Sequence, residues 1–387
     1  MARRAGRQGR AGRHAPAAPA DVQLALQRTG GLGHGAGAAS RPLQESSPMT
    51  RRDALTFIGL IALLVVAMVV ATAFGTGSIS PLRALRIFWD TLIGANGDYP
   101  AWQRTTLVWG RLPRVLVAAL VGGGLALTGA VMQAMFRNPM AEPGVLGISA
   151  GAAFGAVTAL YLGGTTFSML LGPAGAFIGA LGCALLVYAL ASGGRGQVAT
   201  TTLLLAGVAV GSIVSALTSF VLALSLREWE IGRQSLSWLM GDFEGRSWVH
   251  VALAFPLTLI GCVWLMLRGR ELNVLLTGEA SALALGVNVA ELRRDLIVWT
   301  SLVTAATVAV VGAIGFVGLI VPHLLRLLLG PDNRRLLPAA FLGGATFLVA
   351  ADMLCRVASL TELRPGVVTS LVGGPFFLYL LMGSRRA

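Results

Sequence analysis

Long apolar runs separated by short polar segments dominate the chain from residue 54 to its end. One run, Val115–Phe136, has 22 residues and no charge, and as a helix it can cross a hydrocarbon core of about 30 Å. The pattern predicts an all-α integral membrane protein with about ten transmembrane helices and both chain ends on one side. We expect these helices at 54–74, 115–136, two within 143–194, one within 195–227, then 248–267, 295–311, 315–329, 336–358 and 366–381.

A polar hinge, Arg137–Pro143, separates the second helix from the third. Its two prolines and two opposite charges stop the preceding helix. The third helix starts on Gly147, Gly151 and Gly155, and their spacing of four places them on one helical face. Such a face lets another helix approach backbone to backbone, as in packed membrane bundles.

Two further segments, 75–113 and 226–247, are mixed in character and rich in Trp. Trp concentrates at membrane–water interfaces. We expect both segments to be external, and the first to form a loop with short interfacial helices.

The composition agrees with a membrane protein, because 55% of the residues are hydrophobic and only 12% are charged. All basic residues are Arg, so the chain lacks the Lys of a phosphate-binding loop and ATP hydrolysis would need a partner. The net charge of +13 does not indicate nucleic-acid binding, since the Arg flank apolar runs or lie in the N-terminal tail. Cys183, Cys262 and Cys355 lie in separate apolar runs, which predicts buried thiols and neither a structural metal site nor a disulfide framework. No cofactor is expected.

Residues 1–52 carry nine Arg and no apolar period that could form a core, so we expect a disordered tail. Met49 is a candidate start within it. The next run, 54–74, exceeds the about 7–15 apolar residues of a signal peptide and predicts a membrane helix. The permease-like domain is therefore expected over 53–387.

The region around the hinge resembles the FecCD-type permeases, the membrane subunits of ABC importers for ferric siderophores, haem and vitamin B12. Members of this family carry RLPR, a Gly-rich helix and GAxMQxxxxNPxAxPxxLG. The matching residues here are Arg111-Leu112-Pro113-Arg114, Gly129-Ala130, Met132-Gln133, Asn138-Pro139, Ala141, Pro143 and Leu146-Gly147.

The resemblance covers about residues 54–385 and implies a transport subunit that is not itself an enzyme. It implies ATP-binding cassette subunits on the cytoplasmic side, a substrate-binding protein outside, and a second permease copy or paralogue in the lipid bilayer. Substrate would cross the bacterial plasma membrane between the two permeases, along helices five and ten. Ferric siderophore is the expected cargo because it is the commonest in the family, with haem and vitamin B12 as alternatives.

Segment 268–294 is the candidate ATPase-coupling segment, because it is too polar to cross a membrane and too apolar for a free loop. At helical spacing, Ala280, Leu283, Ala284 and Val287 could form one face. The segment is similar to the family's GExSAxxLG coupling element, which implies this role for Gly278, Glu279, Ser281, Ala282, Leu285 and Gly286. An ordinary interfacial helix is the alternative.

Arg111, Arg114 and Arg356 are similar to the external arginines that receive carboxylates of the binding protein in this family. Charge-assisted pairs suit a reversible contact. Two other interpretations remain open: these side chains could reach lipid phosphate, and Arg356 could pair with Asp352 four residues earlier.

Thr200 and Thr201, at the inner end of helix five, match the cytoplasmic gate of the family, with helix capping as the alternative. His323 and Arg326 lie in a stretch that resembles the family's GFxGLxxPHxxR. For His323 we favour a structural hydrogen-bonding role over proton relay. Ser149 lies in a GxSxG pattern, but it belongs to an apolar helix and not to the strand–turn–helix of a hydrolase.

The arginines of the tail flank the first helix, so both termini are expected in the cytoplasm. Four residues recur at an offset of 183: Gly129-Ala130, Pro139 and Gly147 against Gly312-Ala313, Pro322 and Gly330. We interpret them as an inverted repeat of helices 2–5 and 7–10. An ion-coupled transporter is the alternative from another class, and Asp352 is its candidate carboxylate.

Overall fold

The computed structural model describes residues 50–74, 79–95, 97–163, 170–192, 200–358 and 363–384. It separates residues 1–50, of which only Thr50 is described, from residues 51–387, and everything below concerns the second unit. Every regular element of the described residues is a helix. The predicted disordered tail lies outside the described residues, except that its last two positions, Arg51 and Arg52, already belong to a helix.

Ten apolar helices in the described residues account for the predicted membrane spans, which confirms the all-α fold. Seven are long and apolar enough to cross a membrane: α2 (Arg51–Ala73), α5 (Leu112–Phe136) with its N-terminal extension, α7 (Leu171–Ser192), α8 (Thr200–Ser225), α10 (Trp248–Leu267), α13 (Val289–Val311) and α15 (Asn333–Ala358). Three further apolar helices are α6 (Ile148–Gly163), α14 (Val317–Leu329) and α16 (Pro365–Ser384).

The second span differs from the prediction at its start. Helix α4 (Ala101–Thr105), a π-helical turn (Thr106–Arg111) and α5 form one continuous helix of 36 residues. The expected loop over 75–113 is therefore helical from residue 101 onward, because no Gly or Pro pair interrupts it and Pro113 is accommodated in the first turn of α5.

The polar segments form short helices. Helix α3 (Pro81–Leu92) precedes α4, and α9 (Trp229–Leu239) precedes α10. Helices α11 (Gly269–Leu276) and α12 (Glu279–Ala284) occupy the predicted coupling segment, and a 3-10 turn (Pro143–Leu146) closes the hinge.

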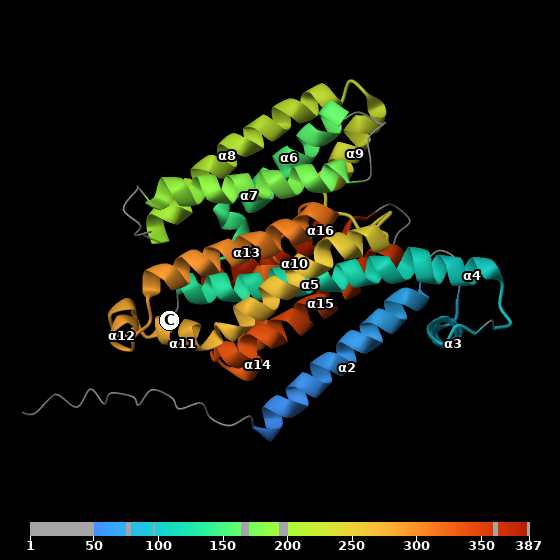
Figure 1. Cartoon of the computed structure of the whole chain (residues 1–387), viewed down its shortest axis with the longest axis horizontal. Helices are drawn as coiled ribbons and strands as arrows, with labels where there is room; N and C mark the ends of the chain where they lie inside the picture. The colour runs from blue at the N-terminus through green and yellow to red at the C-terminus, as the bar shows by residue number, and fades with distance from the viewer. Residues whose placement is uncertain are drawn as a thin grey trace, which may run out of the picture. The chain divides into compact units, whose positions relative to one another are not determined.

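Glycines bring the helix backbones together. A Cβ at Gly151 would lie 2.3 Å from the carbonyl oxygen of Gly179, and one at Gly155 would lie 2.0 Å from that of Gly175. These contacts join α6 to α7, whose ribbons run side by side in Figure 1. The predicted glycine face is thus confirmed at Gly151 and Gly155, since only glycine permits this backbone separation.

Helices α2 and α15 run parallel and in register. Arg335 donates to Asp53 at one end of the pair (2.6 Å), and Arg356 donates to the carbonyl of Phe74 at the other (2.9 Å). Both pairs are separated by 282 residues. Because most of α2 is otherwise exposed, these polar contacts fix it against the bundle at both ends.

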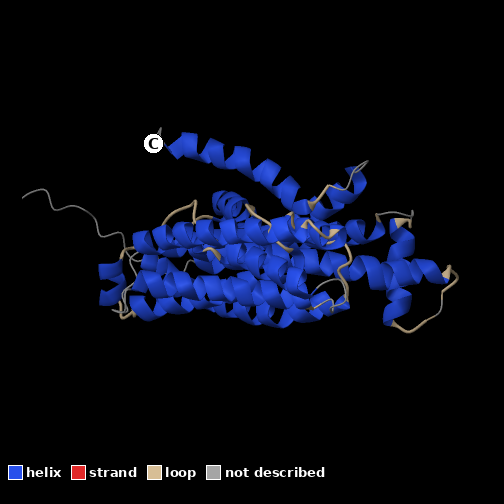
Figure 2. Ribbon diagram, turned by 90° about the horizontal axis from the view of Figure 1, so that it is seen from above, coloured by secondary structure: helices blue, strands red, loops and turns tan. Residues whose placement is uncertain are grey.

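We name the two ends of the bundle by their residues. The arginine end holds Arg111, Arg114 and Arg356, and the α12 end holds α11, α12 and the start of α15. In Figure 1 the long helices run across the view between these ends. Helix α16 diverges from the bundle and ends at the marked C-terminus in Figure 2.

In both halves the second helix is the shortest, a feature that an inverted repeat of helices 2–5 and 7–10 would share. Helices α5 to α8 have 25, 16, 22 and 26 residues, and α13 to α16 have 23, 13, 26 and 20. The predicted residue matches at an offset of 183 are wrong, however. Gly129 lies inside α5 whereas Gly312 follows α13, and Pro139 lies in the hinge whereas Pro322 lies inside α14. Chance recurrence of Gly, Ala and Pro in a Gly-rich chain explains the matches.

Candidate functional site

Asp352 on α15 is the centre of the arginine end. Its side chain is 1% exposed, and Arg114 of α5 donates to both carboxylate oxygens, with a shortest distance of 2.7 Å. Arg356 lies one turn further along α15, with Nε 3.1 Å from Oδ2. The pair of Asp352 with Arg356, left open by the sequence, is therefore present.

Arg111 is buried at the junction of α2 and α5. Its Nη1 donates to the carbonyls of Thr72 (3.1 Å) and Ala73 (2.6 Å), the last residues of α2. A guanidinium suits this place, because the C-terminal carbonyls of a helix lack intrahelical donors and carry partial negative charge. Arg111 thus caps α2.

All three predicted docking arginines consequently have partners within the chain. Arg114 and Arg356 keep 19% and 13% of their side chains exposed, so a partner's carboxylate could contact the exposed edges of these two guanidiniums. Arg111 is buried, and a partner could contact it only after a rearrangement of the chain. Two guanidiniums around one carboxylate leave an excess positive charge at this end. Docking by these residues stays a prediction.

A second network at the arginine end was missed by the sequence analysis. Asp242, in the turn before α10, accepts from Arg364 at the start of α16 and from Ser237 of α9 (3.3 Å). The Asp242 backbone N–H also donates to Val311, the last residue of α13 (2.8 Å). The network joins α9, α13 and α16 at one carboxylate. Charged residues next to membrane spans were its only sequence signal.

At the α12 end, Glu279 is held within the chain. Its Oε1 lies 2.5 Å from Arg293 of α13 and 3.9 Å from Arg137, the left-handed residue that ends α5. About half of the Glu279 side chain remains exposed. The carboxylate therefore ties α12 to two membrane helices.

The predicted coupling residues on and around α12 do not all face outward. Ser281 and Leu285 are exposed, whereas Ala282 is fully buried and holds α12 against the chain. Gly278 and Gly286 have φ of 117° and 81°, the region that favours glycine, and they begin and end this helix. Ala282 can therefore support a docking surface but cannot contact a partner directly.

The predicted outward face of α12 is only partly present. Ala280, Leu283 and Ala284 are exposed, with Leu283 at 61%, but Val287 is half-buried against the core. Helix α12 itself lies at the extreme end of the bundle (Figure 1), so these exposed residues form an apolar tip there.

Of the two predicted gate residues, Thr201 is exposed in the first turn of α8. Thr200 begins the same helix, and its side chain lies outside the described residues. Further along α8, Gly207 packs on the 3-10 turn that follows the hinge, since a Cβ there would lie 2.0 Å from the carbonyl of Val145. The gate itself stays a prediction.

Helices α8 and α16 expose apolar side chains over much of their length. Examples are Leu205 and Phe220 on α8 (66% and 63%) and Leu371 and Tyr379 on α16 (74% each). Large contiguous apolar surfaces mark contacts with protein or lipid. These two helices are the ones that the family resemblance expects along the pathway.

Glu142 in the hinge contacts the second break of the bundle. Its carboxylate accepts a hydrogen bond from the backbone of Phe316, the left-handed residue that precedes α14. The α5–α6 and α13–α14 breaks therefore meet at one carboxylate.

Arg326 has a structural hydrogen-bonding role. It donates to Gln133 of α5 (3.0 Å), and Gln133 in turn donates to the carbonyl of Gly318 in α14 (3.1 Å). His323 packs edge-on against Phe376 of α16, with ring centroids 5.9 Å apart, and its hydrogen-bonding role stays a prediction. Ser149 lies in α6 with no strand before it in the described region, so no nucleophile elbow forms there.

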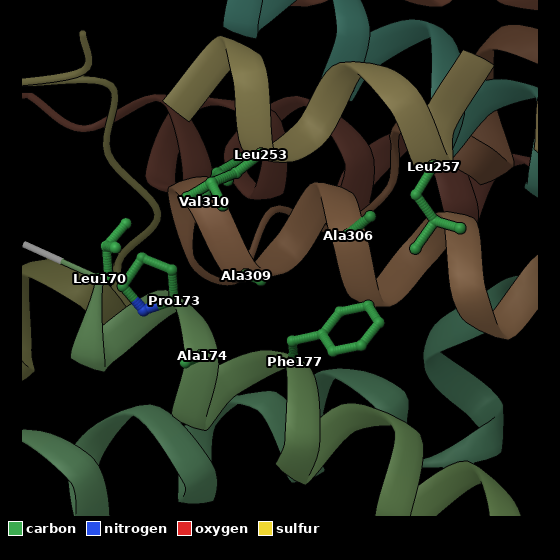
Figure 3. A pocket seen from close by; sticks show the side chains of 9 residues that line it. All are labelled: Leu170, Pro173, Ala174, Phe177, Leu253, Leu257, Ala306, Ala309 and Val310. Atoms are coloured by element: carbon green, nitrogen blue, oxygen red, sulfur yellow. The ribbon is translucent and has the colours of Figure 1, made fainter. Parts of the chain in front are cut away.

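A cavity of about 360 Å³ lies between α7, α10 and α13. Figure 3 shows Phe177, Leu253 and Val310 among its lining side chains, all of which are apolar. With no polar lining group, this cavity cannot orient a polar cargo. The three cysteines are buried, as predicted.

Comparison with known proteins places this geometry in a family. Residues 63–383 match the model of the FecCD transport family. The cobalamin import system permease protein BtuC of Halobacterium salinarum is 50% identical over 273 residues, which are 70% of this chain and 72% of the relative. The vitamin B12 import system permease protein BtuC of Klebsiella pneumoniae is 41% identical over 337 residues, 87% of this chain and 96% of the relative.

The chain is also similar to a hemin permease and to a solved ABC transporter structure. The hemin transport system permease protein HmuU of Yersinia pestis is 37% identical and covers 85% of this chain and 96% of its own length. A solved structure of a metal-chelate type ABC transporter in an inward-facing conformation has a TM-score of 0.74 and 33% identity, covering 85% of this chain and 99% of its own. The chain belongs to the FecCD transport family.

Proposed function

We propose that the chain is the membrane-spanning permease subunit of an ATP-driven importer in the plasma membrane. The observation that carries the proposal is the chemical difference between the two ends of the bundle. One end has a positive, partly buried arginine cluster, and the other has a compact helix with an exposed apolar tip. The names of the relatives support it, since two are permeases of import systems and one is the permease of a hemin transport system.

The arginine end would face outward and receive a substrate-binding protein. The α12 end would face the cytoplasm, where the exposed residues Ser281, Leu283 and Leu285 would enter a groove of an ATPase subunit. Glu279 would hold α12 in this orientation through its ion pairs with Arg293 and Arg137. Both termini would then be cytoplasmic.

Two permease copies, or this chain and a paralogue, would enclose the pathway between them. The apolar faces of α8 and α16 support this arrangement, because a second subunit would cover surface that the single chain leaves exposed. Thr200 and Thr201 would close the cytoplasmic end of the pathway with small hydroxyl side chains.

The proposed cargo is a metal chelate, with cobalamin as the first candidate. Two of the relatives named above are called cobalamin or vitamin B12 permeases and one a hemin permease. Ferric siderophore, the expectation from the sequence, has no such support among these three and becomes an alternative with haem. All share a metal ion enclosed by a large organic ligand.

The test is uptake by cells that lack the native chain and carry either the unaltered protein or Leu283→Arg. Labelled cobalamin, ferric siderophore and haem are supplied separately. We expect cobalamin uptake that is lost in Leu283→Arg together with the ATPase subunits that co-purify. Trp229→Arg, an 82% exposed position at the arginine end, is the control and should retain those subunits.

Three outcomes separate the parts of the proposal. Uptake of siderophore or haem alone would overturn the cargo and leave the ATP-driven mechanism intact. Uptake that survives in Leu283→Arg would overturn the docking surface on α12. Uptake that collapses only with the proton or sodium gradient would overturn the importer class.

A further inference from the structure

Helix α3 is attached to the bundle by a narrow face. Ala84 and Ile87 are buried in a small cluster with Ala73, Ile79 and Leu107. These contacts are with the end of α2 and the turn before α5. They leave the rest of the α3 circumference uncovered by the described residues.

The uncovered side of α3 carries an apolar stripe. Leu82, Leu85, Trp89 and Leu92 follow each other at spacings of three, four and three, which places them on one helical face. Their exposed fractions range from 52% at Leu85 to 85% at Leu82. Phe88, which is 44% exposed, widens the stripe. A soluble surface seldom shows five large apolar side chains on three helical turns.

The orientation of α3 fits a membrane surface. Figure 1 shows α3 nearly end-on beside α4, whereas α2, α5 and α15 run across the view. In Figure 2, turned by 90°, the same segment runs across the direction of the long helices. An axis perpendicular to the spanning helices lies parallel to the membrane plane. Because α2 ends at Ala73 and the helix leading into α5 begins at Ala101, α3 is also confined near the level at which the chain leaves the membrane.

The charges and tryptophans of this segment fit lipid headgroups. Arg83 and Arg86 are exposed. The Nε atom of Arg86 lies 4.0 Å from Oδ2 of Asp90, which is too far for a hydrogen bond. Trp102 and Trp109, 53% and 65% exposed, are seven residues apart on one face of the helix that enters the membrane. Trp is the residue that marks membrane–water interfaces, and Arg pairs with phosphate.

We propose that α3 is an interfacial anchor that binds phospholipid in the leaflet at the arginine end. The stripe of Leu82, Leu85, Trp89 and Leu92 lies at the boundary between headgroups and acyl chains, and Arg83 and Arg86 contact lipid phosphate. An amphipathic helix with this arrangement is buried about 5–10 Å into that boundary. The anchor fixes the depth at which Arg111 and the start of α5 meet the membrane, whichever cargo the protein carries.

Spin labels in lipid nanodiscs test the placement. Leu85→Cys and Leu92→Cys are labelled in the full chain, in nanodiscs of phosphatidylethanolamine and phosphatidylglycerol, and collisions with oxygen and with a water-soluble nickel complex are compared. Val66→Cys, in the middle of α2 and 57% exposed, is the lipid reference, and Glu244→Cys in an exposed turn is the water reference. The native cysteines are buried, and labelling stoichiometry of the unaltered chain checks that they do not react.

For each spin label we take the rate of collisions with oxygen divided by the rate of collisions with the nickel complex. We expect this ratio at Leu85 and Leu92 to lie well above the ratio at Glu244 and close to the ratio at Val66. A ratio equal to that at Glu244 would overturn the proposal and leave α3 as a surface for a soluble protein.

Lipid retention tests the headgroup contact. Native mass spectrometry should find fewer phosphatidylglycerol molecules on the double variant Arg83→Gln/Arg86→Gln than on the unaltered protein. Arg233→Gln, which removes one exposed arginine of α9 at the same end, is the control and should keep them. Equal retention by all three proteins would overturn the role of Arg83 and Arg86.

Discussion

At the scale of single residues, the chain places its few buried charges where helices must be joined. Asp352 binds two arginines and Asp242 joins three helices, while the half-buried Glu142 bridges two backbone breaks. Water cannot solvate such groups inside a membrane, so each needs a partner from the protein. The polar residues of the interior therefore select one arrangement of the helices. Apolar contacts alone would permit several arrangements.

The Asp352 cluster leads to a stability prediction. Asp352→Ala should destabilise the protein by about 3–5 kcal/mol, because it leaves two guanidiniums partly buried without their counter-charge. Thermal unfolding in detergent can be followed with a thiol-reactive dye that reports exposure of the three buried cysteines. Glu230→Ala, which removes an exposed pair with Arg233, is the control and should leave the melting temperature nearly unchanged. Equal melting temperatures for the two variants would contradict the structural role of Asp352.

At the scale of elements, glycine faces and short helices determine how the spans meet. Gly155 illustrates the first point, because the carbonyl of Gly175 occupies the place of its missing side chain. Helix α12 illustrates the second, because Glu279 ties it to α13 and to the end of α5. Ion pairs therefore link α12 to two membrane helices.

Substitution of Gly155 tests the glycine face. Gly155→Ala should destabilise the α6–α7 pair by about 1–3 kcal/mol, the usual cost of overpacking, and should lower the yield of folded protein in size-exclusion chromatography. Gly182→Ala on α7 is the matched control, because no atom lies within 4 Å of the Cβ position there. Similar yields for both variants would show that α6 and α7 can separate without cost.

Charge exchange tests the tether of α12. Glu279→Arg should lower substrate uptake, because it places a positive charge beside Arg293 and Arg137. The double variant Glu279→Arg/Arg293→Glu restores one opposite-charge pair and should recover part of the uptake at equal protein level in the membrane. If the double variant stays as inactive as the single one, Glu279 acts through a partner subunit and not through Arg293.

At the scale of the whole molecule, much of the fold could be predicted because membrane spans need long apolar runs. The boundaries of α10 were predicted to the residue, and the ends of α13 and α15 agree as well. The start of the second span was missed because residues 101–111 are too polar to be read as membrane helix, although they continue α5. Apolar periodicity shows which residues leave water, but not how far a helix extends beyond the membrane.

The candidate site was less predictable. Motif residues such as Arg111 and Glu279 were found by resemblance, but their partners are backbone carbonyls or residues far away in sequence. The link from Gln133 to Arg326 spans 193 residues, and no spacing rule could reveal it. Contacts of this kind depend on the tertiary arrangement of helices, which a single sequence does not encode in any local pattern.

The proposed function is import of a metal chelate with energy from ATP. The most direct test is cobalamin accumulation in proteoliposomes that contain the permease with its co-purified ATPase subunits and the matching binding protein. Enclosed ATP should drive accumulation, ionophores should leave it unchanged, and Leu283→Arg should abolish it. Accumulation without ATP, driven by an imposed proton or sodium gradient, would show that the chain is an ion-coupled transporter and not part of an ATP-driven importer.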